Sequence, residues 1–369
     1  MRTLEMYRLL HLRNPRMAVQ PFVKFLFDFI RLPTRSYVFQ QFSICFDIYM
    51  EICQQVRSKV LGALGHDTLQ WRVKHSCPPC TYSLQDEQKL CFSRLVTYDG
   101  NDLAKRVLRQ RKGDGDEADI VERTDSHHGG GNYFLSRQEV DKWAKENIED
   151  MLRLVSYVAT LLYFLTDMQV VDEFEENPCA DGWHNMANNV SSRMWGIFDE
   201  TGMFVAVCRH GFILIVADMV RSGELAKYPL AVLEYLLQAL EDGLGAGYDV
   251  GCKFAMTVDR SPLGKLAKEK KFKSLIGLFH GHAHCQLCQL RHLGTYVEGL
   301  GLSDLEGCER LFSRTNELAG VYRYASAFHR HQSLRLYFEH LDEVDTPESL
   351  SKWRCTGYHY LHSLKAVSW

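Results

Sequence analysis

Isolated carboxylates beside predicted strands are the residues of this chain best suited to chemistry. Within residues 194–254, two apolar strand-like runs, a helix and a third strand follow one another, and Asp249 falls where the third strand should end. Buried strands that end in carboxylates form the framework of two-metal phosphoryl-transfer sites, because the acids hold the divalent ions. The sequence therefore predicts a carboxylate site of this kind around Asp249.

The elements that would position such acids alternate between strands and helices. Strands are expected, in chain order, over 91–98, Met194–Phe198, Met203–Arg209, Phe212–Met219, Tyr248–Cys252 and Ser274–Phe279. Helices are expected over Leu230–Glu241 and 303–319. This order predicts an α/β (α+β) fold: a ribonuclease-H-like mixed sheet flanked by helices, with an antiparallel meander followed by parallel strands.

The chain divides into five parts by pattern and composition. They are a helical N-terminal region with a C-x-x-C motif (1–90), a first core strand segment (91–107), a helical insertion (108–193), the ribonuclease-H-like core (194–338) and a C-terminal tail (339–369). Within the insertion, residues 113–131 are acidic and Gly-rich, which predicts a disordered loop. Ser136 and Glu139 then form a capping box before two helices near 136–146 and 147–168.

The composition indicates a soluble protein without an overall positive charge for binding nucleic acid. The 369 residues are 46% apolar and 24% charged, which is typical of a soluble globular protein, and the net charge of -3 gives no overall basic field for nucleic acid. DNA contact would therefore need local basic groups. The candidates are Lys105, Arg106, Arg109, Arg111 and Lys112; Lys265, Lys268, Lys270, Lys271 and Lys273; and Arg323, His329, Arg330 and Arg335.

The N-terminus and the cysteines indicate an intracellular protein. The start M-R-T-L-E-M-Y-R has no apolar signal region, and the apolar run Phe22–Ile30 is too short to span a bilayer, so no membrane association is expected. In a reducing compartment the twelve cysteines are expected to be thiols or metal ligands rather than disulfides.

Cys77-Pro-Pro-Cys80 has the spacing of a zinc-ligand pair. Cys179 and His184 could complete a Cys3His site across the insertion. The alternative is a Pro-rich turn with two buried thiols.

A second candidate zinc cluster is the run His280-Gly-His282-Ala-His284-Cys285-x-x-Cys288. On a strand the three imidazoles would point to one side, and imidazole with thiolate suits zinc. The alternative is that this motif follows a core strand and braces the active site through hydrogen bonds.

Several long strings occur in one order along residues 191–338. They are R-M-W-G-I-F-D-E-T-G, C-R-H-G-F, A-D-M-V-R-S-G-E-L-A-K-Y-P-L-A-V, Y-D-V-G-C-K-F, H-G-H-A-H, E-G-L-G-L-S-D-L-E-G-C-E-R-L-F-S and Y-A-S-A-F-H-R-H-Q. Upstream strings include C-P-P-C-T-Y and L-V-T-Y-D-G-N-D-L-A-K-R-V. Together they resemble the Kyakuja-Dileera-Zisupton (KDZ) transposases of eukaryotic DNA transposons over most of residues 7–345.

The resemblance implies transposition through three acids of a DDE-type core. Asp249 in Y-D-V-G-C matches the second acid, and Glu309 in E-R-L-F-S matches the third, with Glu306 one helical turn earlier as the alternative. The first acid is Asp99 in L-V-T-Y-D-G-N or Asp199 in F-D-E-T-G. Asp99 is preferred, because Asp199 would fall in a tight turn rather than on a strand.

The resemblance also implies cofactors and partners. Two Mg²⁺ or Mn²⁺ ions would be held by Asp99, Asp249 and Glu309. The partners would be transposon ends and target DNA in the nucleus, and the family allows a homo-oligomer. Since no separate DNA-binding domain is recognisable, a shortened transposase is expected. The alternative is a catalytically inactive, transposon-derived module that binds DNA or protein.

Overall fold

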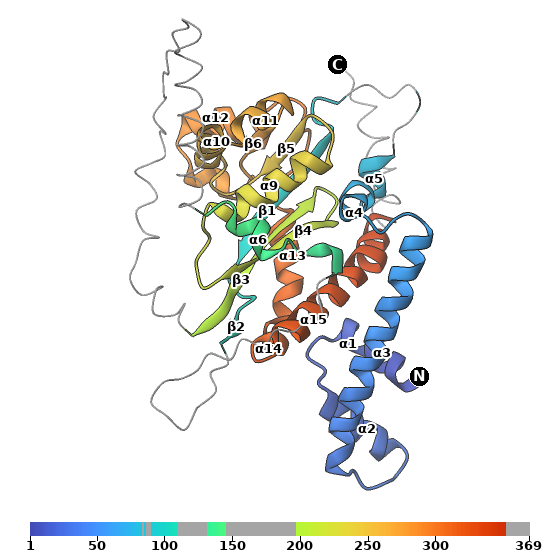
Figure 1. Ribbon diagram of the computed structural model, residues 1–369. Coiled ribbons are helices and arrows are strands. Elements are labelled where there is room, and N and C mark those ends of the chain that lie inside the picture. The colour runs from blue at the N-terminus through green and yellow to red at the C-terminus, as the bar shows by residue number, and fades with distance from the viewer. Residues whose placement is uncertain (83–84, 86–89, 109–130, 145–196, 352–369) are drawn as a thin grey trace, which may run out of the picture.

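A six-stranded mixed sheet lies at the centre of the molecule (Figure 1). The computed structural model describes residues 1–82, 85, 90–108, 131–144 and 197–351. The strands are β1 (Arg94–Asn101), β2 (Arg106–Val107), β3 (Phe198–Cys208), β4 (Ile213–Val220), β5 (Leu244–Gly247) and β6 (Lys273–Leu275). β3 is antiparallel to β1, β2 and β4, whereas β5 is parallel to both β1 and β6. The predicted mixed sheet and the predicted hairpin are thereby confirmed.

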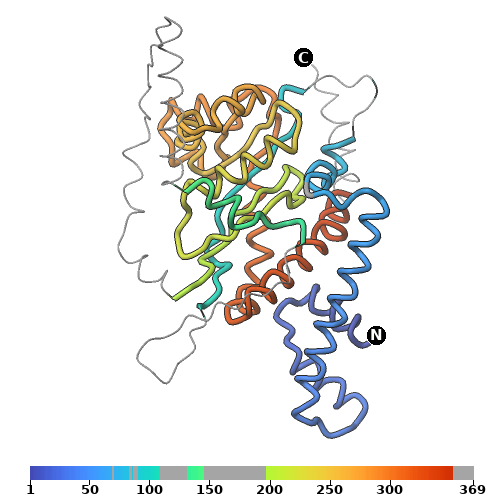
Figure 2. The backbone as a smooth tube through the Cα atoms, viewed as in Figure 1, coloured from blue at the N-terminus to red at the C-terminus, as the bar shows by residue number. Residues whose placement is uncertain are grey.

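Helices cover both faces of this sheet and form a separate N-terminal group. They are α1 (Arg2–Arg13), α2 (Val19–Phe29), α3 (Ser36–Ala63), α4 (Leu69–His75), α5 (Pro78–Thr81), α6 (Arg137–Asp141), α9 (Lys227–Ala239), α10 (Gly251–Arg260), α11 (Gly264–Glu269), α12 (Gln286–His292), α13 (Gly307–Thr315), α14 (Ala319–Tyr322) and α15 (Ala327–His340). Figure 2 shows α1–α3 gathered beside α15, away from the sheet. None of the helices in the described ranges has the length and hydropathy that crossing a bilayer requires.

Strand β3 is buried on both faces. Phe204 and Ala206 join a core that also contains residues of α9, whereas Val205 and Val207 join a second core with residues of α13 and α15. Side chains alternate between the two faces of a strand, so a strand covered on both sides needs a continuous apolar run. This is why residues 203–208 contain no charged side chain.

The prediction of a strand over Tyr248–Cys252 is wrong. β5 ends at Gly247, the next residues turn, and α10 begins at Gly251. The sequence of β5 is L-G-A-G, which has low strand propensity because half of its residues are glycine. A Cβ at Gly245 would lie 2.8 Å from Leu95 Cδ2, and one at Gly247 would lie 2.7 Å from Leu305 Cβ, so close packing restricts both positions to glycine.

Other expectations are borne out, or lie outside the described residues. The capping box of Ser136 and Glu139 opens α6 as predicted. The strand predicted at Met194–Phe198 contributes only Phe198, the first residue of β3, to the described structure. Most of the loop 113–131 and the predicted helix 147–168 lie outside the described residues.

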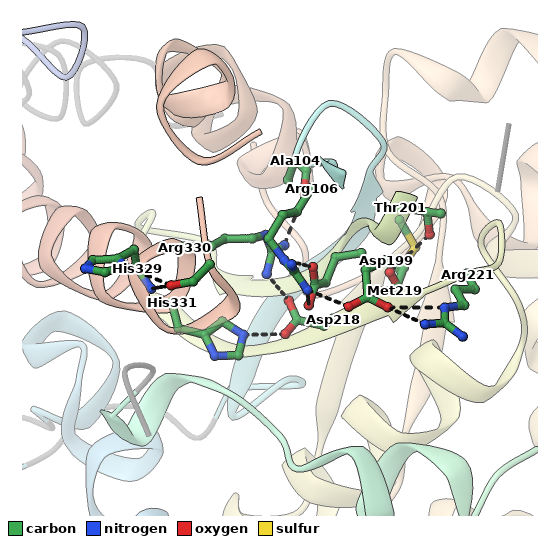
Figure 3. A network of polar contacts seen from close by, with 12 residues as sticks. Ala104, Arg106, Asp199, Thr201, Asp218, Met219, Arg221, His329, Arg330 and His331 are labelled. Atoms are coloured by element: carbon green, nitrogen blue, oxygen red, sulfur yellow. Dashed lines mark hydrogen bonds and ion pairs between the residues drawn. The ribbon is translucent and has the colours of Figure 1, made fainter. Parts of the chain in front are cut away.

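Two residues of the proposed C-terminal DNA-contacting face are buried, which corrects that prediction. Arg330 is fully buried, and its Nη1 atom lies 2.6 Å from Asp218 Oδ1 on β4 (Figure 3). The same guanidinium donates hydrogen bonds to the carbonyls of Ala104 and Gly202. Arg335 is only 3% exposed. Arg330 therefore holds α15 against the sheet instead of facing a ligand.

Replacing Arg330 tests this structural role. Arg330→Met leaves the Asp218 charge buried beside His331 alone, so we expect the free energy of unfolding to fall by roughly 3–5 kcal/mol. Arg310→Met is the matched control, because the Arg310–Asp304 pair is largely exposed and should contribute less than about 1 kcal/mol. Urea denaturation measures both changes; equal losses in the two variants would contradict the assignment.

Candidate active site

The geometry of β1 and β5 places two acids at one edge of the sheet. Thr97 on β1 pairs with Gly247, the last residue of β5, so Asp99 and Asp249 each lie two residues beyond this pair. The two strands are parallel, and the carboxyl ends of parallel strands meet at the same edge, where α/β proteins commonly bind ligands. Asp249 lies in the turn just after β5. The first strand was expected to end at residue 98, just before Asp99, whereas β1 extends to Asn101 and includes Asp99.

Alternation along β1 directs Asp99 toward α13. Asp99 lies on the same face of the strand as Thr97, whose Oγ1 atom is 3.6 Å from Cys308 Sγ on α13. Gly307 permits this close crossing, because a Cβ there would lie 2.8 Å from Thr97 Oγ1. Glu309 follows in the first turn of the same helix and is exposed.

Negative charge is concentrated around Asp99. Burial raises the pKa of Asp99 to about 9, and the charges of Asp249, Glu224 and Glu309 add to this rise. The backbone N–H of Gly100 opposes it by donating a 2.7 Å hydrogen bond to Asp99 Oδ1. Four carboxylates from four segments of the chain therefore interact electrostatically at this edge of the sheet.

Asp249 is held from two sides by histidines. Its Oδ1 atom lies 3.0 Å from His280 Nδ1, and its backbone carbonyl lies 2.8 Å from His284 Nε2. Burial raises the pKa of Asp249, an effect that His280 opposes and Glu309 reinforces. His284 thus hydrogen-bonds to the backbone of this residue, and His280 lies against its carboxylate.

Glu306, the alternative third acid, organises the backbone near the site. It is the N-cap residue of α13, and its Oε1 atom accepts a 2.9 Å hydrogen bond from the Phe279 N–H. Its other oxygen is 3.7 Å from His280 Nδ1. Burial raises its pKa, and the N–H of Phe279 opposes this. Leu305 before it adopts a left-handed φ of 57°, a strained conformation of the kind found near functional sites.

Sequence reasoning missed Glu224, the fourth acid at this edge. The Tyr248 hydroxyl donates a hydrogen bond to its Oε1 atom. A Cβ at Gly100 would lie 2.5 Å from Glu224 Oε2, so glycine beside Asp99 leaves space for this carboxylate. Burial raises the pKa of Glu224, and Asp249 contributes to the rise. In the sequence, Glu224 could have been noticed as an acid that follows the strand now seen as β4.

Asp199, the alternative first acid, lies in different surroundings. It belongs to β3 and not to a tight turn, which corrects that expectation. Its Oδ2 atom is 2.6 Å from Arg106 Nη2, and its Oδ1 atom is 3.1 Å from Arg221 Nη2 (Figure 3). Asp99 therefore interacts electrostatically with Asp249, Glu224 and Glu309, whereas Asp199 forms ion pairs with two arginines.

The histidine-rich motif does not form the predicted strand. β6 ends at Leu275, and residues His280–Ala283 form a 3-10 turn that sends His280 and His284 to different partners. His284 Nδ1 lies 3.5 Å from Cys252 Sγ and 3.4 Å from Cys288 Sγ, a buried group that could hold a metal ion. His282 and Cys285 are exposed. The hydrogen bond from this motif to Asp249 agrees with the bracing role considered as the alternative.

The C-x-x-C motif meets partners that the sequence did not suggest. Cys77 and Cys80 lie beside Cys208 and His210 of the β3–β4 turn, and the four ligand atoms are within 4.8 Å of one another. Cys179 and His184, the partners proposed from the sequence, are outside the described residues. In the sequence, Cys208 and His210 could have been noticed from the C-R-H string at the end of a predicted strand.

Comparison with known proteins gives one family match. The model of the Kyakuja-Dileera-Zisupton transposase family matches residues 92–342. The comparisons with curated proteins and with solved structures found no match. The matched segment contains Asp99 and its three neighbouring acids, whereas Cys77 and Cys80 precede it.

The raised pKa of Asp99 predicts a pH-dependent stability of the metal-free protein. Between the ordinary pKa of 3.8 and the raised value of about 9, the folded state retains a proton that the unfolded state releases, so stability should fall as pH rises through this window. Asp99→Asn removes this loss. In EDTA at pH 8 we expect its unfolding temperature to exceed that of the unmodified protein by roughly 2 °C or more, with the gap closing toward pH 4.

Thermal unfolding followed from pH 4 to pH 9 measures this effect. Asp259→Asn is a suitable control, because Asp259 is exposed and its Oδ1 atom lies 3.6 Å from the exposed Lys268 Nζ. If the unfolding temperatures of Asp99→Asn and of the unmodified protein changed in parallel with pH, ionisation of Asp99 would not destabilise the folded protein, and the prediction would be wrong.

Proposed function

Because the chain belongs to the Kyakuja-Dileera-Zisupton transposase family, we propose that it is a DNA transposase core that cleaves and transfers DNA strands at Asp99, Asp249 and Glu309. The observation that carries the proposal is the concentration of acids around Asp99, whose pKa rises to about 9 through burial and the charges of Asp249, Glu224 and Glu309. Carboxylates that have perturbed pKa values and lie together at one edge of a sheet are typical of catalytic sites. Family membership implies that DNA is the substrate.

The order of strands supports a ribonuclease-H-like core. β4, β3 and β1 form an antiparallel unit, and β5 and β6 continue the sheet in parallel with β1. This is the meander followed by parallel strands that the proposed fold requires. The acids would then come from the central strand β1, from the turn after β5 and from α13.

The carboxylates fit divalent cations. Like charges that are partly buried together raise one another's pKa, and a bound divalent ion reverses this effect by neutralising them. Carboxylate oxygens are the preferred ligands of Mg²⁺ and Mn²⁺. Asp99, Asp249 and Glu309 would hold two such ions, which in this class of site activate the attacking oxygen and stabilise the leaving oxygen.

The surrounding residues position these acids. His280 and His284 fix the carboxylate and the backbone carbonyl of Asp249. The Gly100 amide orients Asp99. Glu306 is already engaged by the Phe279 N–H, which supports Glu309 as the third acid.

Among the acids considered for the first position, Asp99 is supported over Asp199. Asp199 forms ion pairs with Arg106 and Arg221, and two positive neighbours leave less negative charge for a metal ion. Asp99 instead has its pKa raised by burial and, in addition, by the charges of the other proposed ligands.

Neutral isosteres of the acids test the proposal. Asp99→Asn, Asp249→Asn and Glu309→Gln should each lower Mg²⁺-dependent nicking of supercoiled plasmid by roughly 10²–10³-fold or more, the order expected when one preorganised electrostatic contact is lost. Asp199→Asn is the control for the first position and Glu306→Gln for the third, and both should retain most of the activity. Gel quantification of nicked plasmid gives the rates.

Each other outcome has a definite meaning. Loss of nicking in Asp199→Asn, with activity retained in Asp99→Asn, would move the first acid to Asp199. Activity in all five variants would place the site elsewhere. If the unmodified protein binds DNA but never nicks it with Mg²⁺ or Mn²⁺, the chain is a non-catalytic, transposon-derived binding module.

A further inference from the structure

Glu224 lies at the edge of the sheet that carries the proposed active site, but the reaction described so far gives it no role. It belongs to the turn between β4 and α9. We propose that Glu224 is a fourth carboxylate ligand, which shares one of the two divalent ions with Asp99 and Asp249. This inference rests on the proposed function, because it adds a ligand to the same site.

The position of Glu224 is defined by contacts with the immediate neighbours of two proposed ligands. Its Oε1 atom accepts a hydrogen bond from the hydroxyl of Tyr248, the residue before Asp249. Its Oε2 atom lies only 2.5 Å from the place where a Cβ of Gly100, the residue after Asp99, would stand. The carboxylate of Glu224 is therefore held between the chain segments that carry the first and second acids.

Glu224 approaches this edge from the face of the sheet that α9 covers. Gly100 lies on the same face of β1 as Tyr98, and Tyr98 belongs to the core that contains residues of α9. Asp99 lies on the opposite face of β1, toward α13, the helix that carries Glu309. Carboxylates therefore reach the edge from both faces, as ligands that surround an ion must do.

The charges around Glu224 are negative. Among the described residues, the charged groups that act on it are Asp249 and Asp102. Its own charge acts on Asp99, whose pKa is raised by burial, by Asp249 and then by Glu224. Carboxylates that are held together in this way repel one another, and a bound divalent ion reverses the repulsion.

A fourth carboxylate also balances the charge of the site. Asp99, Asp249 and Glu309 supply three negative charges when they are ionised, whereas two divalent ions carry four positive charges. With Glu224 the protein supplies four, so both ions are neutralised before DNA brings the charges of its phosphates. We therefore expect the protein to bind its ions in the absence of DNA.

The turn that carries Glu224 is held by hydrogen bonds. The Tyr228 hydroxyl on α9 accepts a 3.0 Å hydrogen bond from the N–H of Val220, the last residue of β4. The same hydroxyl lies 2.7 Å from Ser222 Oγ, within hydrogen-bond distance. The backbone before Glu224 is thus fixed, and the Tyr248 hydroxyl orients its side chain. A carboxylate positioned in this way is preorganised to bind an ion.

Mn²⁺ binding to the whole 369-residue chain without DNA tests this role. Glu224→Gln removes the charge but keeps an oxygen that can accept the Tyr248 hydrogen bond. We expect it to weaken Mn²⁺ binding roughly 10–100-fold, the loss that follows when even an outer-shell partner of a metal is replaced. Electron paramagnetic resonance of free Mn²⁺ measures the affinity.

Two control variants separate the charge of Glu224 from its structural contacts. Tyr248→Phe removes the hydrogen bond and keeps the acid, so it should weaken Mn²⁺ binding by a smaller factor than Glu224→Gln. Glu241→Gln changes an exposed acid just after the far end of α9 and should leave the affinity unchanged.

Gly100→Ala gives a second test that changes no acid. The added Cβ would stand 2.5 Å from Glu224 Oε2, so this flexible side chain has to move, whereas the backbone N–H that donates to Asp99 is retained. We expect Gly100→Ala alone to weaken Mn²⁺ binding. Combined with Glu224→Gln it should add little to the loss, because both changes act through one carboxylate.

The results distinguish this inference from the proposed function. Mn²⁺ affinity that is unchanged in Glu224→Gln, or lowered equally in Tyr248→Phe, would overturn the role of Glu224 and leave the reaction at the other acids in place. If Glu224→Gln fails to fold, an unchanged affinity in Gly100→Ala would overturn it. Unmodified protein that binds no Mn²⁺ would contradict both this ligand and the two-metal reaction.

Discussion

Repulsion between carboxylates gathered at the carboxyl edge of β1 and β5 is the interaction on which the organisation of this site depends. Burial and the charges of three neighbouring acids raise the pKa of Asp99 far above its ordinary value, so an ionised cluster opposes folding. The surrounding fold has to hold these acids in place, and it does so through elements anchored elsewhere. Histidines fix Asp249, a backbone amide fixes Asp99, and the crossing at Gly307 fixes the helix that carries Glu309.

The sheet provides this anchorage because both of its faces are buried. β3 contributes alternate side chains to two separate apolar cores, and the Arg330–Asp218 pair ties α15 to the strand beyond it. Such a buried pair adds less to net stability than it would cost to break. Rigidity at the centre of the sheet therefore supports a cluster of like charges at its edge, a combination common where a protein binds divalent cations.

The sequence predicted the parts of this structure that have local signals. The apolar run of β3, the capping box at Ser136 and the acids in strings shared with the transposase family were all readable from the chain. β5 was misplaced because contacts with Leu95 and Leu305 select glycine there, and glycine carries no strand propensity. Glu224 and Cys208 each had a local signal, but their placement beside Asp99 and Cys77 could not be predicted, since it depends on chain segments far apart in sequence meeting only after the sheet forms.

The position of β1 also has a consequence for biosynthesis. β1 lies between β3 and β5, yet both of its neighbours follow it in the chain by roughly 100 residues or more. At translation rates of about 5–20 residues per second, the apolar segment Leu95–Tyr98 leaves the ribosome several seconds before either partner strand exists. During that interval it is an unpaired, aggregation-prone strand, and the nascent chain becomes a target for chaperones that recognise exposed apolar segments.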